Sequence, residues 1–164
     1  MALLTSLFQF KAWADAQMFD AVESLGPQAN ADERHNAVRI LNHIHTVDKI
    51  FVGNLQGLPH GQTATNTVET PSLADLNWAS QETDDWFVNY VAGLSAADLA
   101  QDIVFTFTDG DKGRMTREEM LMHVITHGSA HRGAVSRILF TQGITPPRDL
   151  YTKFLHTSQP ERRA

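Results

Sequence analysis

The sequence contains no cysteine, which excludes disulfides, thiolate metal sites and a cysteine nucleophile. Any thiol chemistry would therefore need a thiol supplied by another molecule. The sequence also lacks a run of about 18 apolar residues that could cross a membrane, and its N-terminus lacks the basic lead and continuous apolar stretch of a signal peptide. We expect a cytoplasmic protein that has no membrane partner.

Positive charge is scarce as well. The chain has 13 Lys and Arg against 19 Asp and Glu, and the resulting net charge of −6 argues against a nucleic-acid partner bound through its phosphates. Hydrophobic residues make up 42% and charged residues 20% of the sequence, as in ordinary folded domains. A chain of 164 residues suits one domain, so we expect a single domain over residues 1–164 with one functional site.

Apolar residues recur at helical spacing in four long segments. A capping box, Thr116 with Glu119, marks the start of the last of these segments. The pattern predicts a four-helix bundle with a short C-terminal extension. The predicted helices run from Leu4 to Leu25, from about Ala31 to Gln56, from Pro71-Ser72 to about Ala92, and from Thr116 to about Thr141.

Two segments between these helices are predicted to be non-helical. The stretch from His60 to Thr70 is polar and without periodicity, which indicates a loop. Residues Ile103 to Phe107 are β-prone and lead into the turn-rich segment Thr108 to Gly113, which could close a small hairpin. We expect this hairpin to be a peripheral addition. The predicted fold class is all-α, a four-helix bundle with a short β-prone hairpin before the last long helix.

Three of the eight histidines, His123, His127 and His131, stand four residues apart on the last predicted helix. Residues four apart share a helix face, and the apolar residues on this face direct His127 and His131 into the bundle. Two imidazoles at this spacing can bind one metal ion, and a third ligand from another element would then be needed. The same spacing also fits histidines that are simply buried in the core.

The second predicted helix offers two candidates for that third ligand. His43 lies on the apolar face of the helix, whereas His45 lies near the opposite edge of this face. Periodicity mildly favours His43 and leaves His45 open. His123 is a candidate pocket residue, and Asp48 is either a buried hydrogen-bond acceptor behind the ligands or a partner in a salt bridge between helices.

Several better-known sites do not fit. The run from His127 to His131 has no glutamate after the first histidine, so it is not a zinc-protease motif. The Glu-x-x-His pairs of ferritin-like sites are missing, and the segment starting at Asp109 lacks the glycine and the final glutamate of a calcium loop. Walker, Rossmann and nucleophile-elbow motifs are missing too. A three-histidine site remains, and its imidazoles suit zinc, nickel, copper and iron.

The segments that carry these histidines resemble a known family. HVITHGSAHRGAVSRIL (residues 123–139) resembles the last-helix signature of the DinB-like proteins, a superfamily of metal-binding four-helix bundles that includes the bacillithiol and mycothiol S-transferases. QFKAWADAQMFDAVESL is similar to the family's first helix, ILNHIHTVDKIFVGNLQG to its second helix and TPPRDLYTKFL to its C-terminal segment. The resemblance thus covers nearly the whole chain.

The resemblance implies that His43, His127 and His131 correspond to the family's three metal histidines, which decides against His45. It also implies a homodimer.

The implied function is that of a transferase. One divalent transition metal, zinc or nickel ahead of iron or copper, would activate a low-molecular-weight thiol to attack an electrophilic substrate. Arg132 is a candidate to hold an anionic thiol or substrate, with an outward-facing ion pair as the alternative. Two other functions stay open: a hydrolase that uses metal-bound water, and a non-enzymatic stress protein that binds a metal or another ligand.

Overall fold

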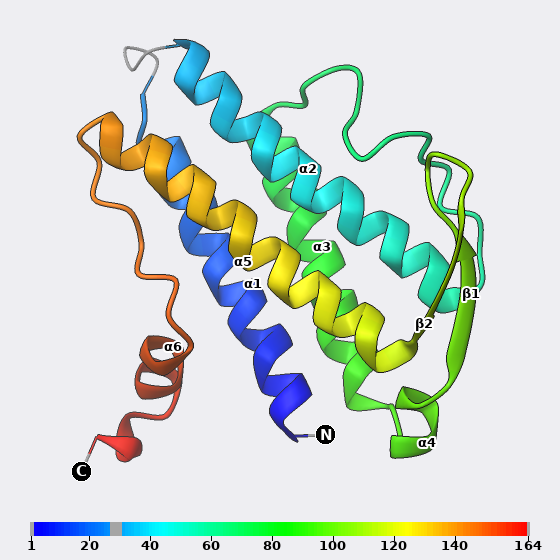
Figure 1. Cartoon of the computed structure of the whole chain (residues 1–164). Helices are drawn as coiled ribbons and strands as arrows, with labels where there is room; N and C mark the ends of the chain where they lie inside the picture. Colours follow the sequence, from blue (N-terminus) through cyan, green and yellow to red (C-terminus); the bar gives the residue numbers. More distant parts are fainter. Residues whose placement is uncertain (1, 27–30, 164) are drawn as a thin grey trace.

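The computed structural model describes residues 2–26 and 31–163. Four long helices form its main body, and a two-stranded hairpin precedes the last of them (Figure 1), which confirms the predicted fold class. None of the described helices is long and apolar enough to span a membrane. The long helices are α1 (Ala2–Glu23), α2 (Ala31–Gln56), α3 (Leu73–Ala92) and α5 (Arg117–Thr141); the smaller elements are α4 (Ala96–Leu99), β1 (Asp102–Thr106), β2 (Lys112–Thr116), α6 (Tyr151–Ser158) and the short 3-10 helix η1 (Pro160–Arg162).

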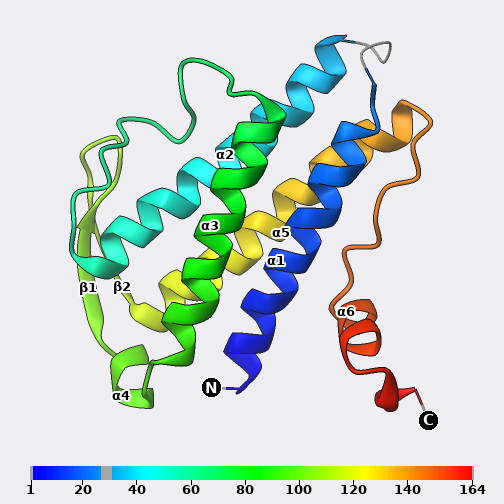
Figure 2. The same ribbon diagram turned by 180° about the vertical axis from the view of Figure 1, so that it is seen from behind.

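Helices α2 and α3 run in the same direction, opposite to α1 and α5 (Figures 1 and 2). The loop between α2 and α3 must therefore return along the bundle. It begins at the end of α2, where the Leu58 amide donates a hydrogen bond to the Gly53 carbonyl, and later meets the first half of α2, where Arg39 donates to the Thr67 carbonyl at 2.7 Å. The predicted polar loop thus runs back along α2 from its C-terminal end to its first half.

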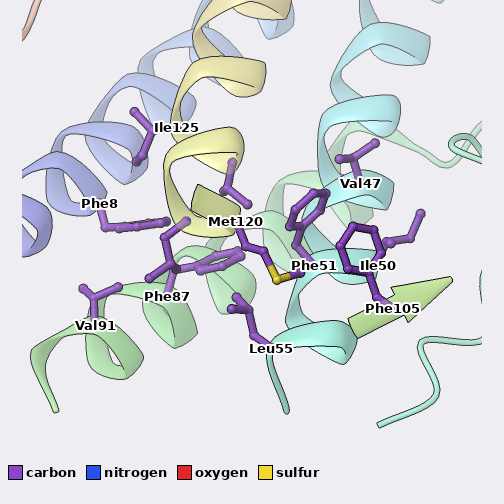
Figure 3. Packing of buried hydrophobic residues seen from close by; sticks show 12 residues of the cluster. Phe8, Val47, Ile50, Phe51, Leu55, Phe87, Val91, Phe105, Met120 and Ile125 are labelled. Atoms are coloured by element: carbon purple, nitrogen blue, oxygen red, sulfur yellow. The ribbon is translucent and has the colours of Figure 1, made fainter. Parts of the chain in front are cut away.

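The bundle interior has two apolar clusters and a layer of buried polar side chains. Along α1, α3 and α5 the charged residues of this polar layer lie between the residues of the two clusters. Phe8, Phe51 and Phe87 belong to the first cluster (Figure 3), and Met18 and Phe19 belong to the second. All four long helices contribute charged side chains to the polar layer. Its buried charged members are Lys11, Asp15, Asp48, Asp84 and Arg132.

The hairpin is short and antiparallel, and Phe105 packs it against the bundle. In its register Phe105 lies opposite Gly113. A Cβ atom on Gly113 would lie 2.6 Å from the Phe105 ring and 2.8 Å from the Phe107 ring, so this position requires glycine. Phe105 packs in the first apolar cluster beside Phe51 and Ile50 of α2 (Figure 3). The hairpin therefore covers the C-terminal half of α2.

Candidate metal centre

Three histidines from two neighbouring helices form a compact cluster. His43 comes from α2, and His127 and His131 come from α5; one ring nitrogen of each lies within 4.8 Å of those of the other two. The Nε2 atoms of His43 and His127 are 3.0 Å apart. Tetrahedral nitrogen ligands at typical zinc distances are separated by about 3.3–3.4 Å, so these two nitrogens are close to the spacing that one ion requires.

The helical period explains which histidines meet. His127 and His131 are one turn apart and share the face of α5 that packs against α2. His45 is two residues from His43, so its side chain points to another side of α2, where it lines a separate cavity with Lys49 and Trp86. The structure thus brings together the three predicted histidines and separates His45 from them.

A backbone carbonyl orients His43. Its Nδ1 is 2.7 Å from the Thr65 carbonyl oxygen, which can only accept a hydrogen bond, so Nδ1 carries the proton and Nε2 keeps a lone pair directed at His127. The loop around Thr65 is held by buried Asn42, whose amide donates to the side chains of Asn66 and Thr67. The crossover loop therefore prepares one nitrogen of the cluster to bind a metal.

The imidazoles of α5 are held neutral by their surroundings. Burial lowers the pKa of His127 to about 3, with further lowering from the neighbouring His131 and His43. Burial, and then His43, lowers the pKa of His131. The Nδ1 atom of His127 is buried and has no hydrogen-bond partner among the described residues. Neutral imidazoles are the form that binds metals, so this set of donors fits a divalent transition metal.

A cavity of about 400 Å³ opens beside the cluster. The hairpin supplies one of its walls, so the expectation that the hairpin is peripheral was wrong. The physical reason is that Phe105 packs into the core and carries the neighbouring hairpin residues over the face of α2 and α5. The cavity is lined by His43, Val47, Ile50, Phe51, Asn54, Thr65, Phe105, Thr106, Phe107, Thr108, Met115, His123 and His127.

His123 lies in the wall of this cavity, between the core and the cluster. Its ring stacks on Phe51 with centroids 4.7 Å apart and planes 12° apart, and on His127 at 5.4 Å and 23°. Burial lowers the pKa of His123. A continuous stack of rings thus connects the first apolar cluster with the histidine cluster.

The family model described as the DinB family matches residues 1–163. The chain belongs to the DinB family. No curated protein and no solved structure matches it. Family membership and the three-histidine cluster both fit metal binding.

In this DinB-family protein, Arg132 occupies neither of the two positions that were expected for it. The side chain is 1% exposed, and its guanidinium binds Asp15 at 2.9 Å and Asp149 at 2.8 Å. Burial opposes its charge, but the two carboxylates outweigh burial and raise the pKa of Arg132. It neither lines the cavity nor faces outward, because one residue beyond His131 the helix has turned by about 100° toward the bundle interior.

The polar layer of the DinB-family bundle is centred on Lys11. Its ammonium group lies 2.8 Å from Asp15, 2.7 Å from Asp48 and 2.6 Å from Asp84. Asp48 thus forms the salt bridge between helices that was one of its two predicted roles. Burial raises the pKa of Asp48 to about 6 and that of Asp84 to about 7, although Lys11 opposes both shifts.

Gly128 makes room for this layer. A Cβ atom on Gly128 would lie 3.1 Å from the Arg132 guanidinium and 3.7 Å from Lys11. In the His127–Arg132 run, the two histidines thus serve the cluster, while the glycine and the arginine serve the ion network behind it. Sequence reasoning missed Lys11 and Asp15. The available signal was two charged residues, four apart, on the apolar face of the first helix.

Proposed function

We propose that this DinB-family protein is a metal-dependent thiol S-transferase. His43, His127 and His131 hold one divalent transition metal, zinc or nickel, and a low-molecular-weight thiol attacks an electrophilic small molecule. The observation that carries the proposal is that a three-imidazole cluster adjoins an apolar cavity. Structural zinc sites normally use four protein ligands, whereas three ligands leave a position for a reactant.

The proposed reaction transfers the sulfur of a thiol to an electrophilic carbon. The thiol loses its proton to solvent, its sulfur forms a bond to the electrophilic carbon, and the leaving group departs with the bonding electron pair. A bound divalent metal supplies Lewis-acid chemistry that keeps a coordinated thiol deprotonated near neutral pH. Because the chain has no cysteine, the thiol must come from another molecule.

The chain's own residues orient and enclose the reactants. The Thr65 carbonyl fixes the ring of His43, and the stack of Phe51, His123 and His127 gives the cavity one rigid wall. The lining is mostly apolar, which favours binding of an apolar electrophile beside the cluster. These features support transfer between two small molecules at the histidine cluster.

The test is a conjugation assay with the full chain loaded with zinc or nickel. A panel of low-molecular-weight thiols is mixed with 1-chloro-2,4-dinitrobenzene, and release of chloride and formation of the thioether are followed. We expect metal-dependent conjugation that His127→Ala abolishes and the control His45→Ala retains. Metal-loaded protein that conjugates none of the thiols would reject the transferase; metal-dependent cleavage of p-nitrophenyl esters without a thiol would identify a hydrolase instead.

A further inference from the structure

Among the residues that the structure describes, no Lys, Arg, Asp or Glu lines the cavity beside the histidine cluster. This sets it apart from the open cavity near the start of α2, whose lining includes Glu23, Arg34, Arg39 and Glu69. Lys112 donates to the hydroxyl of the lining residue Thr106 at 2.8 Å but is not itself among the lining residues. Apart from a metal ion at the histidine cluster, a charged ligand in this cavity would lose its hydration without gaining an opposite charge in return.

Aromatic rings stand on two walls of the cavity. On the hairpin, Phe105 and Phe107 have ring centroids 4.8 Å apart and planes at 71°, and both rings pack over Gly113. On the helices, Phe51 and His123 are stacked nearly parallel. Such preformed ring walls favour flat aromatic ligands, because stacked and edge-on ring pairs are stabilised beyond the burial of their area.

Four polar residues of the lining have uncharged side chains. Asn54, Thr65, Thr106 and Thr108 provide an amide and hydroxyl groups, which can bind a nitro, carbonyl or hydroxyl substituent. His43 and His127 also line the cavity, whereas His131 does not, so a bound ligand reaches the cluster from one side. The volume of about 400 Å³ lies in the lower part of the range for small-molecule sites.

We infer that this cavity binds an uncharged aromatic molecule built from one or two flat ring systems, such as a phenyl or a naphthyl group. Identifying that molecule as the electrophile of thiol transfer rests on the proposed function, whereas its binding does not. The lining therefore selects the electrophile by its missing charge and its planarity. Apart from a metal ion held by the histidines, an anionic substrate would find no counter-charge among the described residues that line the cavity.

Two fluorescent probes with the same ring system test the inference. N-phenyl-1-naphthylamine is uncharged, and 1-anilinonaphthalene-8-sulfonate adds one sulfonate to the same scaffold. The full chain is titrated with each, with metal loaded and after chelation. In the chelated protein, where no metal ion can pair with the sulfonate, we expect one bound N-phenyl-1-naphthylamine per chain and an affinity at least tenfold higher than that of the sulfonate. Equal or tighter binding of the sulfonate to the chelated protein would overturn the inference.

Matched variants on the hairpin locate the bound probe. Phe107 lines the cavity and is 48% exposed, whereas Val104 is 71% exposed and is not a lining residue. We expect Phe107→Ala to weaken binding of the uncharged probe by about threefold to tenfold, and Val104→Ala to leave it unchanged. Equal effects of the two substitutions would place the probe elsewhere and overturn the inference.

A third variant should reverse the charge preference. Met115 lines the cavity from β2, and Met115→Lys keeps a long unbranched side chain while adding a positive charge. We expect the sulfonate to gain affinity relative to the uncharged probe by at least tenfold, and an unchanged ratio would count against the cavity as the binding site. Circular dichroism checks that each variant is folded.

The probe titration and the conjugation assay fail independently. Thiol transfer to charged electrophiles, combined with no binding of the uncharged probe, would overturn the ligand class and keep the transferase. Binding of the uncharged probe without any thiol transfer would keep the ligand class and reject the transferase.

Discussion

The Nδ1 atom of His43 lies 2.7 Å from the carbonyl oxygen of Thr65, so a ring on α2 is fixed by the loop that returns to α3. The backbone supplies this contact, and a side-chain substitution at Thr65 would not remove it. The loop itself is positioned by Asn42, which is 2% exposed and donates to the side chains of Asn66 and Thr67. The metal affinity of the site should therefore depend on a residue that is not a ligand.

Asn42→Ala should lower the affinity for zinc by about 10- to 100-fold, the usual effect of removing a group that orients a ligand. The reason is that the loop loses its buried anchor and the Thr65 carbonyl no longer holds His43 in place. Competition with a chromophoric chelator measures the affinity. Thr63→Ala is the control, because Thr63 is exposed on the same loop. Unchanged affinity in Asn42→Ala would show that the loop does not orient the ligand.

Two glycines of α5 should respond oppositely to alanine. At Gly133 no neighbouring atom of the described residues lies within 4 Å of an added Cβ, so Gly133→Ala should raise the free energy of unfolding by up to about 1 kcal/mol through helix propensity alone. At Gly128 the added Cβ would lie 3.1 Å from the Arg132 guanidinium, which two carboxylates hold in place. Gly128→Ala should therefore destabilise the fold. Urea unfolding measures both, and stabilisation by both substitutions would show that the ion network yields easily.

Arg132→Ala should lower the free energy of unfolding by about 3–5 kcal/mol, because it leaves the buried carboxylate of Asp15 without one of its cations. Arg137 is exposed on the same helix, and Arg137→Ala should change stability by about 0.5 kcal/mol or less. Urea unfolding at neutral pH compares the two variants. A cost at Arg132 no larger than the cost at Arg137 would contradict the structural role of the buried network.

Asp84 should make stability fall as the pH rises. Burial raises its pKa to about 7 in the folded protein, against about 3.9 in an unfolded chain. The folded state therefore binds the carboxyl proton of Asp84 more tightly than the unfolded chain does. The stability that this group contributes is fully present below pH about 4 and is lost as the pH rises through about 7.

Asp84→Asn isolates this effect, because asparagine stays neutral at every pH while Asp15, Asp48 and His45 titrate in both proteins. The free energy of unfolding of the wild type minus that of the variant should decline from pH 4 to 7, by at most about 1.4 kcal/mol per pH unit. Above pH 7 this difference in the free energy of unfolding should no longer change with pH. A difference that grows with pH would mean that Lys11 lowers the pKa of Asp84 instead.

The long helices could be predicted from the sequence because each has an apolar face with a 3.6-residue period. The predicted bounds of the second helix, Ala31 to Gln56, agree with the structure, and so does the Thr116–Glu119 capping box. The grouping of His127 with His131 follows from the same period. Periodicity alone did not decide between His43 and His45, because His43 lies on the broad apolar face of the helix and His45 lies near the opposite edge of that face.

Contacts that depend on tertiary structure could not be predicted. The Thr65 carbonyl belongs to a loop without periodicity, and its approach to His43 depends on the parallel arrangement of α2 and α3. Arg132 was placed wrongly because a sequence shows which residues are charged but not which charges are buried together. The hairpin was predicted as an element, but its role as a cavity wall depends on the packing of Phe105 against α2.

The most direct test of the account is elemental analysis of natively purified protein, with metal counted per chain in the wild type, in the His127→Ala/His131→Ala double variant and in the His45→Ala control. The account predicts about one equivalent of a transition metal in the wild type and in His45→Ala, and none in the double variant. A wild-type protein that carries no metal and binds neither added zinc nor added nickel would contradict it.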